Sequence, residues 1–480
     1  MVLHYAVLVA YHTVLALLSL NGLHRLWMIW AYRRHQTYPR PALPSEWPMV
    51  TVQLPLFNER YVVERLLQAV SALDYPVDRL HIQVLDDSTE ATTELAAMRV
   101  SELQQQGFDA EFLHRTHRFG FKAGALQEGL TSAKGDLLAI LDADFVPPPS
   151  FLKATVPHLL AEPQLGMVQA RWGHLNATDS WLTEAQSILL DGHFVVEHTA
   201  RHHSGRWFNF NGTAGVWRRQ AIADAGGWSH DTLTEDMDLS YRAQLAGWSF
   251  RYLVDVMVPA ELPDGMAAFK TQQHRWAKGS LQCARKLLPT IWGSQASLAI
   301  KLEATTHMLA NLSYPLVIVL TLLMPAAVTA RVRHGGPVLL TIDLVLFLLA
   351  VLPFLLFYGT AVHGSRVRVG RRWVRLPLAL ALGLGMAASQ TRAVFGGLFG
   401  DVGTFVRTPK RGTAARTGYR ARGSGRSTLD GLTAIEITLA TYMVLACGYA
   451  AGMGYVASLP FLALFAGGYS AVALGSLRRT

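Results

Sequence analysis

The chain has 480 residues, of which 51% are apolar and 16% are charged, and its formal net charge is +9. Soluble domains carry roughly 25% charged residues, so this composition excludes a disordered or fibrous protein and argues against a purely soluble one. The two cysteines, Cys283 and Cys447, exclude a disulfide framework and a zinc cage. The excess of basic residues indicates an anionic partner: nucleic acid, a membrane surface or an anionic substrate. The position of these residues in the chain decides among the three.

The first predicted element is a transmembrane anchor over residues 1–34. Residues 5–23 are mostly apolar, and the basic side chains follow them, between positions 24 and 34. A signal peptide carries its positive charge before the apolar run instead. We therefore expect an uncleaved anchor whose C-terminal side faces the cytosol.

Residues 35–300 contain no apolar run long enough to cross a bilayer and form the predicted cytosolic domain. Apolar strands alternate there with amphipathic helices. The expected strands are 50–54, 81–85, 110–113 and 137–141, and the expected helices are 62–73, 93–106 and 123–130. This alternation predicts an α/β fold, with a parallel sheet that binds ligands at the carboxyl ends of its strands.

Acidic residues follow two of these strands. Asp142 and Asp144 are one residue apart, and alternate side chains of an extended segment point the same way, so both carboxylates can face one ion. Two carboxylates suit Mg²⁺ or Mn²⁺, with diphosphate oxygens and water as the remaining ligands. Asp86 and Asp87 end the neighbouring strand, where they either bind a nucleotide or cap the next helix.

A second acidic motif, Thr234-Glu235-Asp236, opens a predicted helix. The positive end of a helix keeps a carboxylate ionised, which suits a general base, although simple capping by Thr234 is the alternative. Lys122 stands at another helix start, where it either meets a phosphate or remains solvated.

Gln272, Arg275 and Trp276 lie where the soluble part meets the membrane part. Arg275 and Gln272 can hold a phosphate and Trp276 can stack on a sugar ring, although Trp and Arg are also common at membrane interfaces. His198 and His202 have a metal-capable spacing, but no zinc-protease motif surrounds them. We expect a surface pair, or a pair near the acceptor path, rather than a zinc site.

Residues 301–480 form the predicted membrane domain. Apolar runs predict spans at 307–330, 344–362, 437–456 and 459–474. The stretch 376–398 is ambiguous, because it is short and basic loops flank it on both sides. If it spanned, one of these loops would face outward, against the positive-inside rule, so we expect an interfacial or re-entrant helix. Five spans result, with the N-terminus outside and the C-terminus in the cytosol.

The two loops beside 376–398 also explain the net charge. They carry twelve Lys and Arg residues, and the rest of the chain is nearly neutral. A nucleic-acid-binding protein would concentrate its basic residues on its soluble domain, so no nucleic-acid partner is expected.

The order of these motifs resembles the processive inverting glycosyltransferases of family 2, the cellulose-synthase superfamily, and most closely its cellulose-synthase-like mannan and glucan synthases. The resemblance covers about residues 48–456 and also rests on 52–59, 121–126 and 210–218. It implies a GT-A (Rossmann-like) domain joined to a transmembrane channel. The implied activity polymerises a β-linked hexose from GDP-mannose or UDP-glucose, uses Mn²⁺ or Mg²⁺, and passes the growing polysaccharide across the lipid bilayer.

The resemblance also implies a role for each matching residue. The donor nucleotide and its diphosphate would be held by Glu59, Asp86, Asp87, Lys122, Asp142, Gln272 and Arg275. The metal would be held by Asp142 and Asp144. The acceptor would be held by Trp276, Asn211, Gly212 and Thr213. Asp236 would be the general base, with Glu235 and Thr234 beside it.

A cytosolic gating loop is implied within 399–430, where the match is 405–410. Arg407 departs from the cellulose-synthase pattern, which has Val there, and this puts the nucleotide contacts of the loop in doubt. Two other functions stay open, a non-processive enzyme adding one sugar to a lipid and a non-catalytic transporter or glycan-binding protein. Because Arg outnumbers Lys, we expect a bacterial inner membrane protein.

Overall fold

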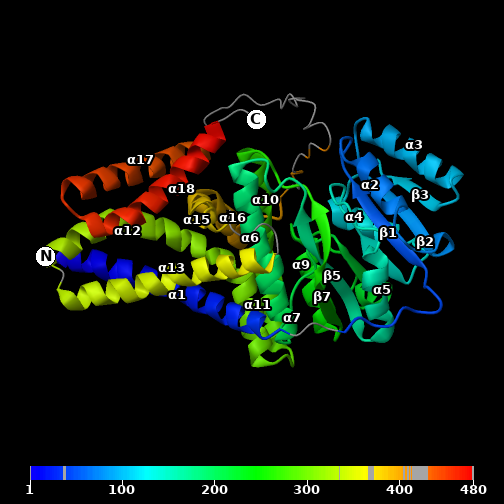
Figure 1. Ribbon diagram of the computed structural model, residues 1–480, viewed down its shortest axis with the longest axis horizontal. Coiled ribbons are helices and arrows are strands. Elements are labelled where there is room, and N and C mark those ends of the chain that lie inside the picture. The colour runs from blue at the N-terminus through cyan, green and yellow to red at the C-terminus, as the bar shows by residue number, and fades with distance from the viewer. Residues whose placement is uncertain are drawn as a thin grey trace.

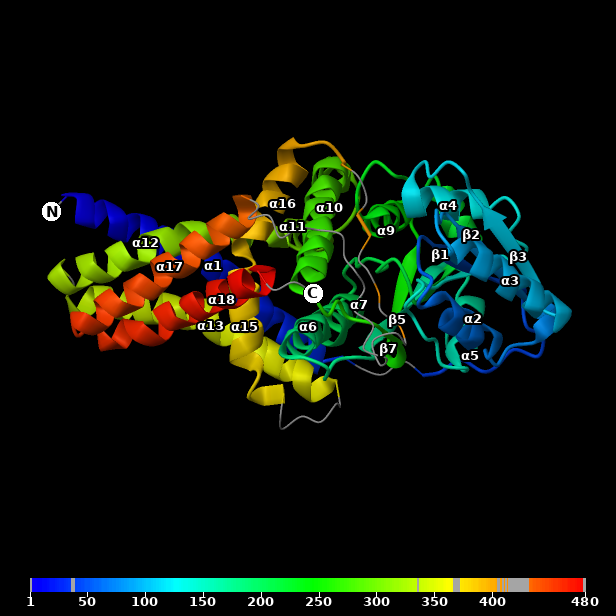
Figure 2. The ribbon, with the colours of Figure 1, turned by 90° about the horizontal axis from the view of Figure 1, so that it is seen from above.

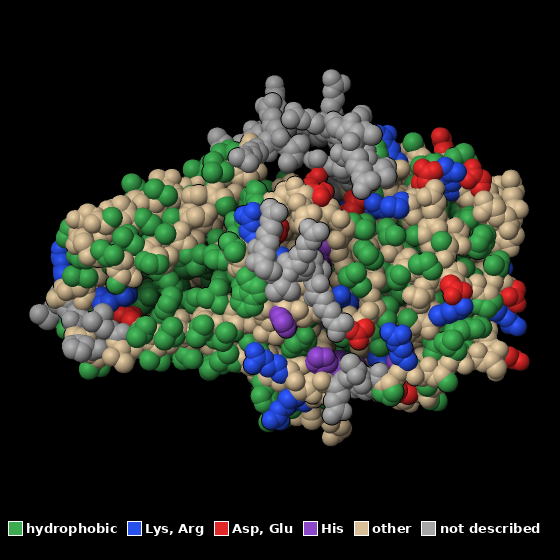
Figure 3. All heavy atoms as spheres, viewed as in Figure 1, with side chains coloured by type: hydrophobic (Ala, Val, Ile, Leu, Met, Phe, Trp, Pro, Cys, Tyr) green, Lys and Arg blue, Asp and Glu red, His purple; other side chains and the backbone are tan. Residues whose placement is uncertain are grey.

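The computed structural model describes residues 2–35, 39–334, 336–365, 372–403, 406–407, 410, 412 and 431–477. An α/β domain lies at one end of the molecule and a bundle of long helices at the other, with shorter helices between them (Figures 1 and 2). Apolar side chains cover much of the visible surface of the bundle, whereas charged side chains gather over the α/β domain (Figure 3).

The described chain forms one seven-stranded sheet, in the order β3-β2-β1-β4-β6-β5-β7. Its strands are β1 (Val50–Leu56), β2 (Leu80–Asp86), β3 (Asp109–His114), β4 (Leu137–Ile140), β5 (Leu165–His174), β6 (Gly215–Arg218) and β7 (Ser249–Ala260). The four expected strands pair in parallel, as predicted, whereas β6, which was not predicted, runs antiparallel to β4 and β5. After β5 the chain remains at the carboxyl edge of the sheet, and β6 begins there. Gly215, the first residue of β6, therefore pairs with Ile140, the last residue of β4.

Helices cover both faces of the sheet, because its central strands are apolar on both sides. In β4, Leu137 and Ala139 pack in the core on one face, and Leu138 and Ile140 pack in the core on the other. The covering helices are α2 (Val63–Ser71), α3 (Thr92–Gln105), α4 (Phe121–Gly129), α5 (Phe151–Ala161), α8 (Arg219–Asp224) and α9 (Glu235–Leu245). The predicted strands and helices of residues 50–141 all lie within about two residues of observed ones.

Four helices connect the sheet to the bundle. They are α6 (Trp181–Asp191), the π-helix η2 (Gly192–Glu197), α7 (His198–His203) and the long α10 (Met266–Gly293). Buried ion pairs join this layer to the bundle, where the α10 side chain Lys270 lies 2.7 Å from the fully buried Glu436. A second pair joins Arg372 to Asp191 of α6 at 2.7 Å.

The bundle contains α1 (Val2–Arg33), α11 (Leu298–Leu309), α12 (Ser313–His334), α13 (Pro337–Gly364), α17 (Gly431–Gly452) and α18 (Leu459–Leu477). Among the described residues, five helical segments are long and apolar enough to cross a membrane, with α11 and α12 forming one of them. The first begins at the end of the bundle farthest from the sheet (Figure 1).

The ambiguous stretch forms α15 (Leu376–Gly385) and α16 (Ala387–Phe399), which meet at a bend of 49°. This geometry fits a broken span or a re-entrant segment, so the number of crossings stays a prediction.

Candidate active site

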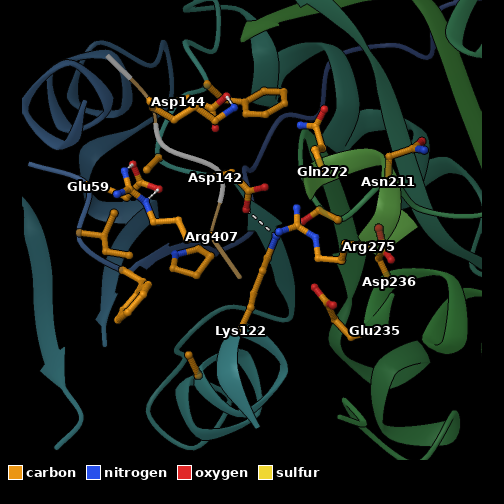
Figure 4. A pocket seen from close by; sticks show the side chains of 18 of the residues that line it. Glu59, Lys122, Asp142, Asp144, Asn211, Glu235, Asp236, Gln272, Arg275 and Arg407 are labelled. Carbon is orange, nitrogen blue, oxygen red and sulfur yellow. Dashed lines mark hydrogen bonds and ion pairs between the residues drawn. The ribbon is translucent and has the colours of Figure 1, made fainter. Parts of the chain in front are cut away.

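A cavity of about 170 Å³ opens at the carboxyl edge of β1 and β4, and most of the predicted site residues line it (Figure 4). Its charged and amide-bearing wall comprises Glu59, Asp87, Arg118, Lys122, Asp142, Asp144, Asn211, Glu235, Asp236, Gln272, Arg275, Arg407 and Lys410. Gly212, Thr234 and Trp276 complete the set of predicted residues on this wall. Two predicted residues, Asp86 and Thr213, are not among its lining residues.

Asp86 supports the cavity from behind instead of contacting a donor. Its side chain is fully buried, and it accepts hydrogen bonds from the Ser88 amide at 3.1 Å and the Thr93 hydroxyl at 2.8 Å. His114 Nδ1 lies 2.8 Å from Oδ2, the oxygen that also accepts from Thr93. With both oxygens occupied, Asp86 holds the turn that presents Asp87.

Thr213 is also fully buried, and its hydroxyl accepts a hydrogen bond from the Asp142 amide at 2.8 Å. It therefore positions Asp142 and does not line the acceptor pocket as predicted. Asn211 and Gly212, which precede Thr213, do reach the cavity wall.

At the β2 end of the cavity, Asp87 is held by Arg115, whose Nε and Nη2 each donate to it at 2.6 Å. The guanidinium of Arg118 lies over the Phe57 ring, 3.3 Å from its centroid. A flat cationic and aromatic surface beside a carboxylate suits a nucleotide base. Sequence reasoning missed both arginines, because nothing local marks them as partners of Asp87.

Glu59 faces the same part of the cavity and forms a bidentate pair with Arg407. Arg407 Nε and Nη2 donate to its two oxygens at 2.9 and 2.5 Å. Burial raises the pKa of Glu59 to about 7, although Arg407 opposes this shift. The residue that departs from the cellulose-synthase pattern thus contacts a predicted donor-binding carboxylate directly.

Each predicted metal ligand is paired with a lysine. Lys122 of α4 donates to Asp142 and, at 2.8 Å, to the Gly212 carbonyl. Lys410 donates to Asp144 at 2.6 Å. Two neighbouring carboxylates that already attract cations fit a hard divalent ion, which prefers oxygen ligands. No cluster of three or more His, Cys, Asp or Glu ligands occurs within the described ranges, so the protein would supply only part of the coordination shell.

Burial lowers the pKa of the Lys122 ammonium, but Asp142, Glu235 and Asp236 outweigh this effect and raise it above its usual value. Lys122 is therefore a permanent cation in the cavity. Figure 4 shows the ends of the Lys122 and Arg275 side chains beside Asp142. Together they form a positive surface that suits a diphosphate.

Asp236 lies in the first turn of α9. Burial raises its pKa to about 7, and the neighbouring Glu235 adds to this shift, while Lys122 and the Met237 amide oppose it. A carboxyl group that titrates near neutrality is suited to take a proton from a hydroxyl. Burial also raises the pKa of Glu235.

The alternative of simple capping by Thr234 is not observed. Thr234 precedes α9 without a capping hydrogen bond to a described residue, and its hydroxyl lies 3.3 Å from Cys283 Sγ on α10. The two segments approach closely at Gly279, where an added Cβ would come within 2.6 Å of Thr234 Cγ2. A glycine in α10 therefore lets this helix pack directly against the acidic turn.

Helix α10 supplies the opposite wall through Gln272, Arg275 and Trp276. Arg275 donates to the Val406 carbonyl at 3.1 Å, and burial lowers the pKa of its guanidinium. The Trp276 ring is tilted against Trp172, with 6.4 Å between ring centroids. These two aromatic rings form a platform at the deep end of the cavity, and Trp172 was not predicted.

A second cavity, of about 480 Å³, continues from the first among the helices of the bundle. The two share Trp172, Asn211, Thr234, Asp236, Gln272 and Trp276 as wall residues. Near this junction the wall is polar, and deeper in the bundle it is mainly apolar, with residues such as Leu15, Val317, Phe354, Leu380 and Phe465. A path therefore leads from Asp236 into the helical bundle.

Two family models match the chain, "Glycosyl transferase family 2" over residues 51–216 and "Glycosyl transferase family group 2" over residues 137–362. The chain contains a family 2 glycosyltransferase domain. This confirms the family resemblance, and the cavity lies within the matched region except for the segment that carries Arg407 and Lys410.

The glycosyltransferase domain is similar to plant enzymes. Glucomannan 4-beta-mannosyltransferase 1 of Cyamopsis tetragonoloba is 45% identical over 251 residues, which cover 52% of this chain and 48% of the relative. Glucomannan 4-beta-mannosyltransferase 2 of Arabidopsis thaliana is 44% identical over 251 residues, with 52% and 47% covered. The match thus spans about half the length of these curated relatives.

Among solved structures, the chain is similar to a mannosyltransferase from Pyrobaculum calidifontis in complex with GDP-Man and Mn²⁺. The TM-score is 0.55 at 21% sequence identity, and the match covers 81% of this chain and 99% of that one. The similarity establishes a GT-A-like fold for the glycosyltransferase domain.

Of the two positions expected for His198, at the surface or near the acceptor path, the surface position is wrong. This residue is fully buried, with its ring 4.3 Å from His193 and 5.1 Å from Tyr252 between centroids. Burial lowers its pKa well below the usual value, so it is a neutral core residue. His202 is partly buried against Phe208, at a centroid distance of 5.8 Å.

Proposed function

We propose that this protein is a membrane mannosyltransferase that transfers mannose from GDP-mannose to a growing β-1,4-linked polysaccharide, inverts the anomeric configuration, and passes the product across the membrane. One observation carries the proposal. The cavity that holds the predicted donor residues opens, at Asp236 and Trp276, into a second cavity between the helices of the bundle. A transferase that releases a soluble product needs no such path.

The donor class is supported by two independent likenesses. The curated relatives are named as 4-beta-mannosyltransferases, and the structural neighbour was solved with GDP-Man and Mn²⁺. In this chain the base would lie beside Asp87, Arg118 and Phe57, and the diphosphate would lie between Lys122 and Arg275.

A divalent ion, Mn²⁺ or Mg²⁺, would be held by Asp142 and Asp144, where it would neutralise the charge on the diphosphate. Lys410 donates to Oδ2 of Asp144, so its ammonium would compete with such an ion for this carboxylate. The described residues leave the other ligand positions to diphosphate oxygens and water.

The chemical step is a single displacement. Asp236 Oδ accepts the proton of the acceptor hydroxyl while that oxygen attacks the anomeric carbon of the donor sugar. The bond from the anomeric carbon to the diphosphate breaks on the opposite side, which inverts the configuration. The electron pair leaves with the diphosphate, where Lys122, Arg275 and Gln272 stabilise the charge. One base is sufficient, because no covalent intermediate forms.

The acceptor sugar would stack on Trp276 and Trp172, and the chain behind it would occupy the second cavity. After each transfer the polymer advances by one sugar, so the new terminal hydroxyl takes the place of the old one beside Asp236. The predicted bacterial inner membrane stays a prediction that rests on composition, since the curated relatives come from plants.

The test uses the purified full chain in sealed proteoliposomes with Mn²⁺. We expect radiolabelled GDP-mannose, and not UDP-glucose, to yield a polymer that endo-β-mannanase digests and that accumulates on the side opposite the catalytic domain. The proposal is overturned if neither donor is turned over, with or without mannooligosaccharide primers.

Product size separates the remaining alternatives. A ladder or large polymer on gel filtration supports processive synthesis, whereas a single sugar on an extracted lipid supports the non-processive enzyme. A non-catalytic transporter or glycan-binding protein would keep its function in Asp236→Asn, in which the proposed enzyme loses synthesis while still folded.

A further inference from the structure

Polar side chains line the wall of the second cavity where it leaves the cleft. They come from α1, from the π-helix η2 and from residues 310–334, and comprise Asn21, Arg25, His193, Glu197, Asn311 and Tyr314. The proposed mechanism uses none of them. Their charged members are Arg25 and Glu197, which form an ion pair on the cavity wall.

Arg25 belongs to the basic residues that follow the first apolar run of the sequence, and the positive-inside rule alone accounts for flanking charges. Arg33 and Arg34 fit that role, because they are exposed at the end of α1 and just beyond it. Arg25 lies farther inside the helix and lines the cavity. Charged side chains within membrane-spanning segments are costly, and those that face a cavity usually serve a function.

The guanidinium of Arg25 is held in place and still open to the cavity. Its Cζ lies 4.5 Å from the centroid of the fully buried Phe357 ring. Nη1 donates to Glu197, whereas Nε and Nη2 form no hydrogen bond with any residue that the structure describes. One fifth of the side-chain surface remains accessible, at 20%. Arg25 therefore has N–H donors to offer to a molecule in the cavity.

Glu197 offers an acceptor on the same wall. An ionised carboxylate has about four lone pairs, two on each oxygen. On Oε2 both are used, because His193 Nδ1 lies 3.0 Å away and Arg201 Nη1 lies 3.3 Å away. On Oε1 only Arg25 donates, so one lone pair is left among the described contacts. The pair thus presents hydrogen-bond donors and an acceptor side by side.

The pair follows the acceptor end of the cleft along the path. Asn211, which lines both cavities together with Asp236, has its Nδ2 at 2.9 Å from His193 Nε2. His193 contacts Glu197, and Glu197 contacts Arg25. A polysaccharide whose terminal hydroxyl lies beside Asp236 would therefore have its earlier sugar units beside this pair.

We propose that Arg25 and Glu197 form a binding subsite for the sugar units behind the acceptor terminus, in which Arg25 donates to one hydroxyl and Glu197 Oε1 accepts a hydrogen bond from its neighbour. The inference rests on the proposed function and deepens it. Adjacent hydroxyls of a hexose supply both an acceptor and a donor, whereas a lipid chain supplies neither. The rings of Phe354 and Tyr358 line the same cavity and suit the apolar faces of sugars.

The experiment measures the acceptor KM at saturating GDP-mannose for β-1,4-mannooligosaccharides from the disaccharide to the hexasaccharide. The short primer occupies only the acceptor end, and the long one also reaches the subsite. We expect the wild-type KM to fall about tenfold from the shortest to the longest primer. Arg25→Met, which keeps the apolar stem but removes the donors, should abolish this fall, as expected for lost hydrogen bonds to a charged group.

The length dependence separates binding from a structural role, because a general disturbance of the fold would change the KM of all primers alike. The Kd for GDP-mannose should stay within twofold, since neither Arg25 nor Glu197 lines the donor cavity. Arg33→Met is the matched control, with the same substitution in the same helix at an exposed position. It should keep the wild-type length dependence.

Three results would overturn the inference: a wild-type KM that does not depend on primer length, an unchanged length dependence in Arg25→Met, or an equal loss in Arg33→Met. If Arg25→Met does not fold, Arg25→Lys decides. It keeps a cation beside Glu197 but loses the planar set of donors, and should reduce the length dependence at least threefold.

A wild type that transfers mannose to no primer contradicts the proposed function instead. Isothermal titration of the full chain with mannohexaose then tests the subsite without any transfer. We expect a Kd about tenfold weaker in Arg25→Met than in the wild type. Equal Kd values, or no binding to the wild type, would overturn the subsite, so the two failures are distinct.

Discussion

At the scale of single residues, the cleft pairs most of its carboxylates with cations. Asp87, Asp142 and Asp144 each contact an arginine or lysine, and Glu59 contacts Arg407. Asp236 forms no ion pair with a described residue. The adjacent Glu235 forms no ion pair with a described residue either, and burial together with the neighbouring Glu235 raises the pKa of Asp236 to about 7, at the position of the proposed base.

The first prediction concerns this base. Because the pKa of Asp236 is raised to about 7, its protonated, inactive form predominates below that pH, and the transfer rate should rise with pH and level off above about 7. Asp236→Asn should lower kcat by roughly 10²–10⁴-fold and remove this pH dependence. Steady-state rates between pH 5.5 and 8.5 check both statements.

Asp109→Asn, which removes a carboxylate from an exposed pair with Lys134, is the control and should be unaffected. An Asp236→Asn variant within tenfold of wild-type kcat would contradict the role of Asp236.

The second prediction concerns the ammonium of Lys410, which lies on a predicted metal ligand. Lys410→Ala should strengthen Mn²⁺ binding in the absence of nucleotide about fivefold, since an ion pair on the order of 1 kcal/mol no longer has to break. Mn²⁺ titrations followed by electron paramagnetic resonance measure this. Asp144→Asn should weaken binding at least tenfold.

Lys134→Ala, which removes the cation of the exposed Asp109 pair, should leave Mn²⁺ affinity unchanged. Weaker Mn²⁺ binding in Lys410→Ala would show that the lysine does not compete for the site.

At the scale of elements, α10 joins the cleft to the helical bundle. It carries Gln272, Arg275 and Trp276 on the cleft side and Lys270 on the bundle side, where the ammonium neutralises the fully buried Glu436. Its contact with the acidic turn at Gly279 leaves no room for a side chain. The position of Asp236, the proposed base, therefore depends on the packing of this helix.

The third prediction tests that packing. Gly279→Ala places a Cβ within 2.6 Å of Thr234 Cγ2, so we expect a loss of about 1–3 kcal/mol in stability and a lower kcat. Gly293→Ala, at the end of the same helix, meets no atom within 4 Å and is the matched control. Thermal unfolding and initial rates are the measurements, and equal behaviour of the two variants would contradict the prediction.

At the scale of the whole molecule, the long helices run alternately away from and toward the α/β domain (Figure 1). Five crossings would place the two ends of the chain on opposite sides of the membrane, whereas six would place them on the same side. The bent pair α15 and α16 decides between these topologies.

The fourth prediction follows from the basic loops on either side of this pair, which favour five crossings. Alkaline phosphatase, which is active only outside the cytosol, should be active when fused before residue 2. A fluorescent protein that folds in the cytosol should be fluorescent when fused after residue 480. If both reporters show the same side, α15 and α16 form a sixth span.

Much of the architecture could be predicted from the sequence. The strand 50–54 is β1 and the helix 93–106 is α3, because alternating and helical apolar patterns depend only on neighbours along the chain. The acidic motifs were found for a related reason, since the carboxyl ends of adjacent parallel strands meet at one edge. The family model matches then confirmed the resemblance.

Other features depend on segments that are far apart in the chain. Glu59 and Arg407 are 348 residues apart, and no local pattern predicts that they pair. The burial of His198 and of Asp86 was not predicted for the same reason, because polar residue types favour exposure unless a tertiary partner is present.

By itself, the sequence indicated the family through the resemblance of its motifs. Local composition and spacing determined the strand ends that carry the acidic motifs and the division into a polar domain and apolar helices. Only the tertiary structure decided which side chains face the cleft, which carboxylates are neutralised, and that the cleft opens at Asp236 into the helical bundle. Burial and charge pairing depend on every segment packed around a residue, and these are properties of the folded chain.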